Sequence, residues 1–100
     1  MVDLPERAVV AVIRLDFRLP YSGSLKDKRS VVRSFKEKAR SRFSVCVVES
    51  GKQDLADEAS LTLASVSCNG EEARKVLKAA VEFLEDNYPV QVTAVIEEVF

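Results

Sequence analysis

The sequence predicts an α+β domain in which a single four-stranded antiparallel sheet carries two helices on one face. Two observations predict the helices: the segments Ser24–Phe43 and Asn69–Tyr88 repeat apolar residues every three to four positions. A third predicts the strands: the remaining segments are rich in Val, Ile and Leu, and several alternate apolar with polar residues. Because the chain has 100 residues, we expect one domain, spanning residues 1–100.

The first strand is predicted at Ala8–Leu19, after an irregular lead-in at residues 1–7. In its second half, apolar residues alternate with charged ones, so one face packs on the core and the other meets solvent. The charged face consists of Arg14, Asp16 and Arg18. We interpret this face as a cross-strand ladder of ion pairs around the single carboxylate.

The helix at Ser24–Phe43 organises the chain, because it concentrates positive charge. Ser24 is the predicted N-cap, and Asp27 in the first turn suits the positive end of the helix dipole. One arc of this helix holds the apolar residues Leu25, Val32, Phe35, Ala39 and Phe43. The adjacent arc holds five cations, which we call the cationic flank: Lys26, Arg29, Arg33, Lys36 and Arg40.

The charge of this helix contrasts with that of the whole chain. The stretch holds eight basic and two acidic residues, a net charge of +6, whereas the formal net charge of the protein is −1. The rest of the chain is therefore acidic, and the protein has an oriented electric field. Three interpretations stay open: a solvated face with pairs such as Arg33 with Glu37, an anion-binding surface for RNA backbone, or contact with an acidic protein.

The middle of the chain is predicted to form two strands. The first, at Ser44–Glu49, is rich in Val, and the second, at Ser60–Ser67, alternates Leu with polar residues. Between them we expect a turn-rich connection and a short helical turn at Leu55–Glu58. The alternation blurs at Ser65 and Val66, where we expect a bulge.

The second helix is predicted to begin after Asn69, a favourable N-cap with Glu72 three residues later. Pro89 follows the apolar pattern directly, where helices stop. The last strand is predicted at Val90–Phe100.

The order strand, helix, strand, strand, helix, strand defines the ferredoxin-like βαββαβ arrangement, with strands one and three in the centre of the sheet. Both helices then cover one face, and the other face stays open. On the open face we expect Arg14, Asp16, Arg18, Thr62 and Thr93, together with Cys46 and Val48. Because a half-apolar open face in a small domain often becomes a dimer interface, we expect a homodimer, although the sequence does not identify the surface through which it forms.

Composition argues against several kinds of chemistry. Histidine is absent, which removes the commonest general base and metal ligand, and there is no CxxC pair or calcium-loop spacing. Cys46 and Cys68 stand alone, and we expect both to be reduced and partly buried. The longest apolar run, Ala8–Ile13, is too short to span a bilayer, and the first residues lack a signal-peptide pattern. We therefore expect a cytoplasmic protein.

The segment SLKDKR, residues 24–29, follows a strand that ends in Leu19-Pro20, and Gln53-Asp54-Leu55 precedes a Leu-rich strand. Together these segments resemble the YlxP-like family of small uncharacterised bacterial proteins. The resemblance covers nearly the whole chain and implies a ferredoxin-like fold and a dimer. Genes of that family often lie near genes for translation initiation and ribosome maturation, which implies an RNA context. The family has no established catalytic residues, so none is transferred to this sequence.

Three known uses of the same topology fit the residues less well. An RRM stacks bases on aromatic residues of strands one and three, but the third strand has none and Phe17 faces the helices. Acylphosphatase-like chemistry needs an anion cradle before the first helix. Ser22-Gly23-Ser24 is at that place, but the glycine-rich loop and a water-placing Asn are absent. An ACT-type regulatory module uses a Gly-containing loop after strand one, which Gly23 matches weakly.

Our hypothesis is a non-catalytic cytoplasmic protein that binds structured RNA, ribosomal RNA included, through the cationic flank. The residues assigned to this role are Lys26, Arg29, Arg33, Lys36 and Arg40. The alternative is a small-molecule-binding regulatory module, or a protein-interaction module, of ACT-like topology. We expect no catalytic residue, no cofactor and no metal site.

Overall fold

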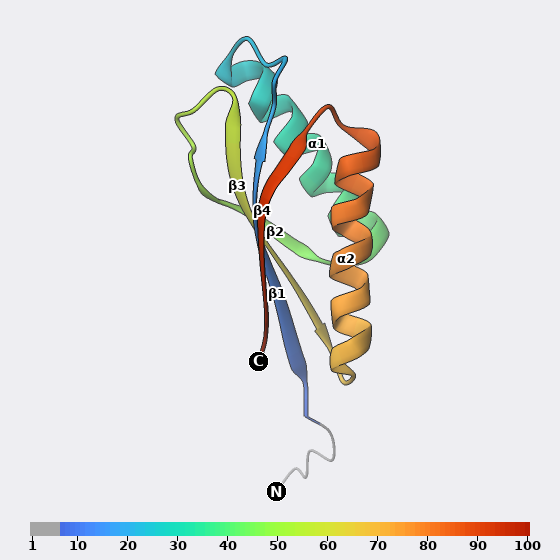
Figure 1. Cartoon of the computed structure of the whole chain (residues 1–100). Coiled ribbons are helices and arrows are strands. Elements are labelled where there is room, and N and C mark those ends of the chain that lie inside the picture. Colours follow the sequence, from blue (N-terminus) through green and yellow to red (C-terminus); the bar gives the residue numbers. More distant parts are fainter. Residues whose placement is uncertain (1–6) are drawn as a thin grey trace, which may run out of the picture.

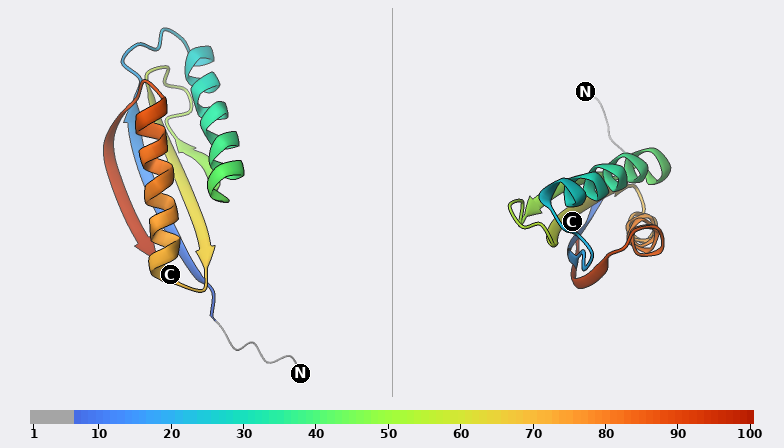
Figure 2. Two further views of the ribbon diagram at one scale, coloured as in Figure 1. Left: turned by 90° about the vertical axis from the view of Figure 1, so that its right-hand side faces the viewer. Right: turned by 90° about the horizontal axis from the view of Figure 1, so that it is seen from above.

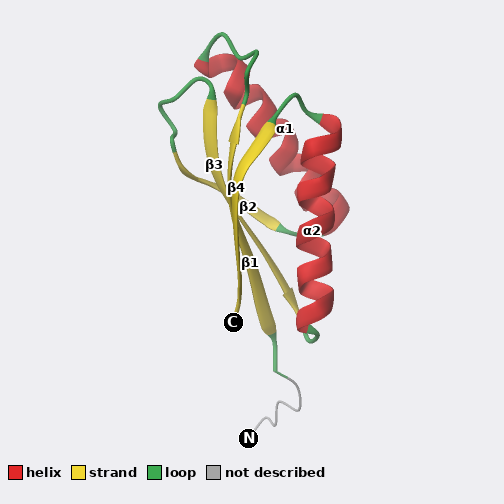
Figure 3. Cartoon of the chain, in the orientation of Figure 1, coloured by secondary structure: helices red, strands yellow, loops and turns green. Residues whose placement is uncertain are grey.

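The computed structural model describes residues 7–100 and contains six regular elements (Figures 1 and 3). In chain order they are β1 (Val9–Arg18), α1 (Leu25–Phe43), β2 (Cys46–Gly51), β3 (Glu58–Ser67), α2 (Gly70–Asn87) and β4 (Gln91–Val99). This is the ferredoxin-like α+β fold that the sequence predicts. Of the expected lead-in, only Arg7 belongs to the described residues.

The four strands form one sheet in the order β2-β3-β1-β4, and every neighbouring pair is antiparallel. Strands β1 and β3 are therefore central, as predicted. Both helices lie on the same face of the sheet (Figure 2). In the left view of that figure, α2 lies between β4 and α1, and no helix lies outside β4. Within residues 7–100, no helix covers the two edges, β2 and β4, or the other face of the sheet.

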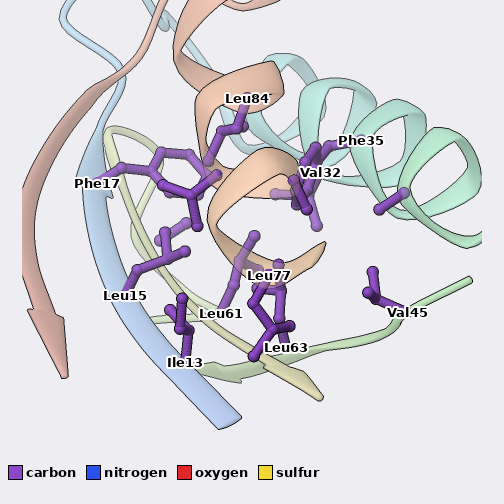
Figure 4. Close-up of a cluster of buried hydrophobic side chains, with 14 of the residues drawn as sticks. Ile13, Leu15, Phe17, Val32, Phe35, Val45, Leu61, Leu63, Leu77 and Leu84 are labelled. Carbon is purple, nitrogen blue, oxygen red and sulfur yellow. The ribbon is translucent and has the colours of Figure 1, made fainter. Parts of the chain in front are cut away.

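The core lies between the sheet and the helices, and it uses the residues that periodicity selects. Phe17 on β1 is 1% exposed and lies close to Leu84 of α2 (Figure 4). On α1, the predicted apolar residues Val32, Phe35 and Ala39 are all buried. Because Phe17 is committed to this core, it cannot stack a base on the open face, as predicted.

Both helices begin at the predicted N-caps. The side-chain oxygen of Ser24 accepts a hydrogen bond from the backbone N–H of Asp27 at 3.1 Å. The carboxylate of Asp27 in turn accepts the N–H of Gly23. At α2, Asn69 Oδ1 accepts the backbone N–H groups of Glu71 and Glu72. Each side chain satisfies donors that have no partner within their own helix.

The middle of the chain departs from the prediction. Strand β2 begins two residues later than expected, because Ser44 caps α1 in a left-handed conformation and Val45 is buried beside the core. The helical turn expected at Leu55–Glu58 is wrong. Glu58 is already the first residue of β3 and pairs with Arg18 of β1.

The bulge expected at Ser65 and Val66 is also wrong. Pairing between β1 and β3 continues through both residues without a shift of register, because each has its own partner on β1. The irregularities lie elsewhere: between Glu49 and Gly51 in the β2–β3 pair, and opposite Asp16 and Phe17 in the β1–β4 pair.

Candidate functional site

The cationic flank lies along α1 as the sequence predicts. Four of its residues are exposed to solvent, and Lys36 is half-buried. Within residues 7–100, no member of the flank forms an ion pair with a carboxylate. The pair weighed as one alternative, Arg33 with Glu37, is therefore not formed. In the described part of the chain, the flank keeps its positive charges unneutralised by direct contact.

The structure brings four of the five cations around one hollow of about 320 Å³. The cations that line it are Arg29, Arg33, Lys36 and Arg40, and Lys26 is the one that does not. Val32, Glu37 and Glu49 complete the lining. Because Glu49 belongs to β2, the hollow lies between α1 and the β2 edge of the sheet.

The sequence pattern did not reveal the special environment of Lys28. It lies on α1 next to the flank, yet its side chain is 0% exposed. Its ammonium group donates to three backbone carbonyls, those of Lys52 at 2.7 Å, Glu58 at 3.1 Å and Gln53 at 3.2 Å. An ammonium has three N–H donors, so these carbonyls use all of them. Lys28 thereby ties the start of α1 to the β2–β3 connection.

Glu49 compensates the charge of Lys28. Its Oε2 atom lies 3.2 Å from Lys28 Nζ, but this buried oxygen accepts no hydrogen bond in the structure. Both observations hold together, because the three N–H groups of Lys28 point to the carbonyls. The contact is therefore ionic, and the pair contributes little net charge to the hollow. The positive charge around the hollow comes from the four cations of the flank, and Glu37 is the lining carboxylate that partly offsets it.

The helical period contains a signal for the burial of Lys28. Lys28, Val32, Phe35 and Ala39 follow one another at steps of four, three and four, and all four are buried. Lys28 thus occupies the buried stripe in the place of an apolar residue. A cation at such a position must find acceptors, since an unpaired charge in the interior is very unfavourable. Of the eight basic residues on this stretch, Lys28 therefore adds no exposed positive charge to the surface of the helix.

A second polar cluster lies on the open face of the sheet. Asp16 accepts a hydrogen bond from Ser60 Oγ at 2.5 Å and binds Lys52 Nζ at 3.2 Å. Lys52 also reaches Glu58 Oε1 at 3.4 Å. The predicted ladder of Asp16 with its flanking arginines is wrong. Arg14 pairs instead with Glu98 across the β1–β4 register, at 3.6 Å.

This cluster shifts the protonation of both partners in directions that favour the charged pair. The hydrogen bond from Ser60, and then the contact with Lys52, hold the pKa of Asp16 below its ordinary value of 3.8. The hydrogen bond to Asp16, and then that to Glu58, raise the pKa of Lys52 above its ordinary value of 10.5. Both groups are charged over the whole physiological range, so the cluster is not a proton donor or acceptor near neutral pH.

The structure corrects one expectation about the two cysteines. Cys46 and Cys68 are free thiols, but both are exposed, so the expectation that they are partly buried is wrong. Cys46 lies on β2 opposite Ala64, with its side chain on the open face, which no helix covers.

Among residues 7–100, no group of three acidic or cysteine side chains is placed to hold a metal ion. Neither described helix is long and apolar enough to cross a bilayer.

Comparison with known proteins identifies the family. Residues 10–96 match the family described as "Protein of unknown function (DUF503)". The chain belongs to this family. Over 68 residues it is 32% identical to the Uncharacterized protein YlxP of Bacillus subtilis (strain 168), covering 68% of this chain and 73% of that protein. The resemblance carried by the SLKDKR segment is thereby confirmed, and in this DUF503 member the first lysine of that segment belongs to the flank and the second is the buried Lys28.

One solved structure shares the fold of this chain at low sequence identity. The VAO-type flavoprotein MtVAO615 of Myceliophthora thermophila C1 matches 94% of this chain with a TM-score of 0.58 and 12% identity. This DUF503 chain spans only 17% of the length of that flavoprotein, and the likeness concerns the fold alone. The de novo designed protein Foldit4 matches 92% of this chain and 97% of its own, with a TM-score of 0.48 and 16% identity.

Proposed function

We propose that this protein is a non-catalytic cytoplasmic RNA-binding protein that contacts the phosphate backbone of structured RNA, ribosomal RNA included, through the cationic flank of α1. The observation that carries the proposal is the hollow, around which Arg29, Arg33, Lys36 and Arg40 converge. Side chains that carry unpaired positive charge and share one concave surface attract a polyanion more strongly than scattered ones do.

The residue types suit phosphate rather than a carboxylate partner of fixed shape. Three of the four cations around the hollow are arginines, whose planar guanidinium groups bind phosphate oxygens in a bidentate manner. From Arg29 to Arg40 the flank extends about 16 Å along the helix axis, which allows several backbone contacts at once. Such contacts read the shape of the RNA and its phosphates, and they carry little information about base sequence.

The open face of the sheet does not offer a competing RNA surface of the RRM kind. Phe17 is buried toward the helices, and β3 contains no aromatic residue. The centre of that face is occupied by the Asp16–Lys52 and Arg14–Glu98 ion pairs. The base-stacking platform that an RRM requires is absent from the described strands β1 and β3.

The proposal is tested by reversing charge on the flank. The triple variant Arg29→Glu, Arg33→Glu and Arg40→Glu is expected to weaken binding to purified ribosomal RNA by more than about 100-fold, because three attractive contacts become repulsive. All three side chains are exposed and unpaired within residues 7–100, so the fold is expected to persist. Fluorescence anisotropy measures the affinity, and circular dichroism checks the fold.

The matched control changes net charge by the same amount elsewhere. The triple variant Arg7→Glu, Arg18→Glu and Lys38→Glu alters three exposed cations outside the flank. Its RNA affinity is expected to fall far less, because its charges do not line the hollow. Equal losses in the two triple variants would show that overall charge, not the flank, determines binding and would overturn the proposal. A second outcome would also overturn the proposal. In it, the folded wild-type protein shows no salt-sensitive RNA binding, and its melting temperature rises to a plateau as one small metabolite is added.

A further inference from the structure

The outer edge of β4 presents unpaired backbone groups. Val10 and Phe100 exchange two backbone hydrogen bonds, so they form a hydrogen-bonded pair at this end of the β1–β4 ladder. This pair fixes which residues of the ladder are hydrogen-bonded to each other and which are not. In an antiparallel pair, alternate residues bond to the neighbouring strand. The residues of β4 that bond to β1 are therefore Ala94, Ile96 and Glu98. The peptide groups of the intervening residues, Val95 and Glu97 among them, point outward along the free edge.

This edge is long and partly apolar. Val95 and Val99 are 50% and 46% exposed, although their side chains lie on the helix-bearing side of the sheet. The opposite edge, β2, has only six residues, whereas β4 has nine, and each pairs with its neighbour through one shift of register, at Ser50 in β2 and at Thr93 in β4. Of the devices that protect an edge strand, β4 has a shift of register at Thr93 and a charge facing α2 at Glu97, whereas its stretch from Ala94 to Ile96 has none and can accept another strand. Along β4, Glu97 and Glu98 are the only charged residues.

A groove of about 560 Å³ lies beside this edge, between β4 and α2. Its apolar floor includes Ile13, Val81 and Val95, and charged residues of α2 line its wall. Val95 and Glu97 of β4 line this groove, so groove and edge adjoin. In the left view of Figure 2, β4 is the outermost strand and α2 is the helix nearest to it. A strand added to β4 would close this groove from the other side.

The charges along α2 indicate which partner fits. The lining residues Lys75 and Lys78 lie in its first half, and Glu82 and Glu85 lie in its second half. These positions are symmetric about Ala80. An antiparallel second copy of the same helix therefore places Lys78 opposite the second copy's Glu82, and Lys75 opposite its Glu85. A surface complementary to itself under a two-fold rotation is the requirement for an isologous dimer.

The pairing of β4 and the charge pattern of α2 place the two-fold axis at nearly the same level of the molecule. Arg74 Nε bonds Glu97 Oε1, which sets these two residues at the same level. From Arg74 to Ala80 the helix rises about 9 Å. From Glu97 back to Val95 the strand covers about 7 Å in the same direction. An axis through Val95 thus passes within roughly one residue of the level of Ala80.

We propose that two copies of this chain pair through β4, antiparallel about a two-fold axis at Val95. The two sheets then form one continuous sheet, and the two α2 helices face each other across the seam with opposite charges aligned. The pairing leaves the Arg14–Glu98 and Asp16–Lys52 ion pairs of the open face in solvent, whereas a face-to-face dimer would cover them. It also leaves the hollow of α1 free, because that hollow lies at the β2 side of the sheet.

Charge swaps across the seam test the proposal by sedimentation velocity and light scattering. Lys78→Glu and Glu82→Lys each set like charges opposite one another at two symmetric places, so each is expected to raise the dimer Kd roughly tenfold or more. The double variant restores opposite charges across the seam and is expected to return the Kd to within about threefold of the wild-type value. A double variant as weak as the single variants would overturn the proposal, as would a wild-type chain that stays monomeric at about 100 µM.

A disulfide trap separates the edge from the open face. In a background with Cys46→Ser and Cys68→Ser, Val95→Cys is expected to form an intermolecular disulfide, because directly opposite residues of a bonded pair have Cα atoms about 5.5 Å apart. Val66→Cys is the matched control, since Val66 is 66% exposed and lies on the open face. Cross-linking through position 66 and not position 95 would assign the dimer to the open face and overturn the edge pairing.

Discussion

Lys28 Nζ lies 2.7 Å from the backbone carbonyl oxygen of Lys52. The side chain of Lys28 is completely buried. Lys52 has a positive φ of 57° and uses its own ammonium group to bind Asp16. One connecting residue is therefore held at its backbone by α1 and at its side chain by β1. The two contacts fix the connection between β2 and β3 from both sides of the sheet.

Removing Lys28 is expected to be among the most destabilising single substitutions in the protein. Lys28→Met keeps most of the length of the side chain but leaves three carbonyls without their donor and Glu49 without its counter-ion. Breaking a buried charged pair costs about 3–5 kcal/mol. Urea unfolding followed by circular dichroism measures the loss of unfolding free energy.

Glu49→Gln is the comparison that isolates the ion pair from the hydrogen bonds. It leaves the three carbonyl acceptors of Lys28 in place and removes only the counter-charge, so it is expected to cost less than Lys28→Met. If the two variants lost the same free energy, the hydrogen bonds to the β2–β3 connection would contribute nothing, and the role assigned to Lys28 would be wrong.

Local sequence pattern was sufficient for the fold and for the position of Lys28 in the buried stripe of α1, but not for the partners of its ammonium group. The alternation in β1 and the helical periods of α1 and α2 reflect burial against one continuous core, so these elements are visible in the sequence. The acceptors of Lys28 lie 24 to 30 residues further along the chain, so no local window contains them. The same reason explains the error at Leu55–Glu58, where pairing of Glu58 with β1 overrides a weak local preference.

Acid pH is expected to weaken the fold through Asp16. Because its pKa is lowered in the folded state, its stabilising contribution is present above the ordinary value of 3.8 and is lost as the pH falls through the folded value. The variant Asp16→Asn has no such titration. The difference in melting temperature between wild type and Asp16→Asn should therefore shrink as the pH falls below 3.8. A difference that stays constant from neutral to strongly acid pH would contradict this account.

The end of α1 offers a stabilising substitution. Ser44 is the C-cap, with φ 54° and ψ 41°, a left-handed conformation that costs a residue with a Cβ about 1–2 kcal/mol. Ser44→Gly removes most of this cost but adds flexibility to the unfolded chain, so a net gain of about 0.5–1 kcal/mol is expected. Thermal unfolding measures the gain. Ser44→Ala keeps the Cβ and should show none, and an equal gain in Ala would rule out the backbone explanation.

The candidate site was predictable in part. The steps of three and four predict that all five cations of the flank share one arc, and in the structure α1 spans all five positions and four of them line one hollow. The hollow itself was not predictable, because its far wall includes Glu49 of β2, and the packing of β2 against α1 is a tertiary contact. Lys26 is separate from the other four, because it does not line this hollow.

This separation leads to a measurable difference between Lys26 and the four cations around the hollow. Each phosphate contact contributes about 0.7–0.9 to the magnitude of the slope of log affinity against log salt. If all five cations contact phosphates, the slope is expected to be about −3.5 to −4.5, and contact by the four around the hollow gives about −2.8 to −3.6. Slopes measured for Lys26→Gln and Arg33→Gln on the same ribosomal RNA distinguish the two cases.

Arg33→Gln is expected to reduce the magnitude of the salt slope by about 0.7–0.9, because Arg33 lines the hollow. Lys26→Gln is expected to leave the slope within about 0.3 of the wild-type value if only the hollow engages RNA. Both changes remove one exposed positive charge from the same helix, so a difference between them reports position and not charge. Equal reductions would extend the contact surface to the first turn of α1. No reduction in either variant would mean that the RNA does not contact this flank.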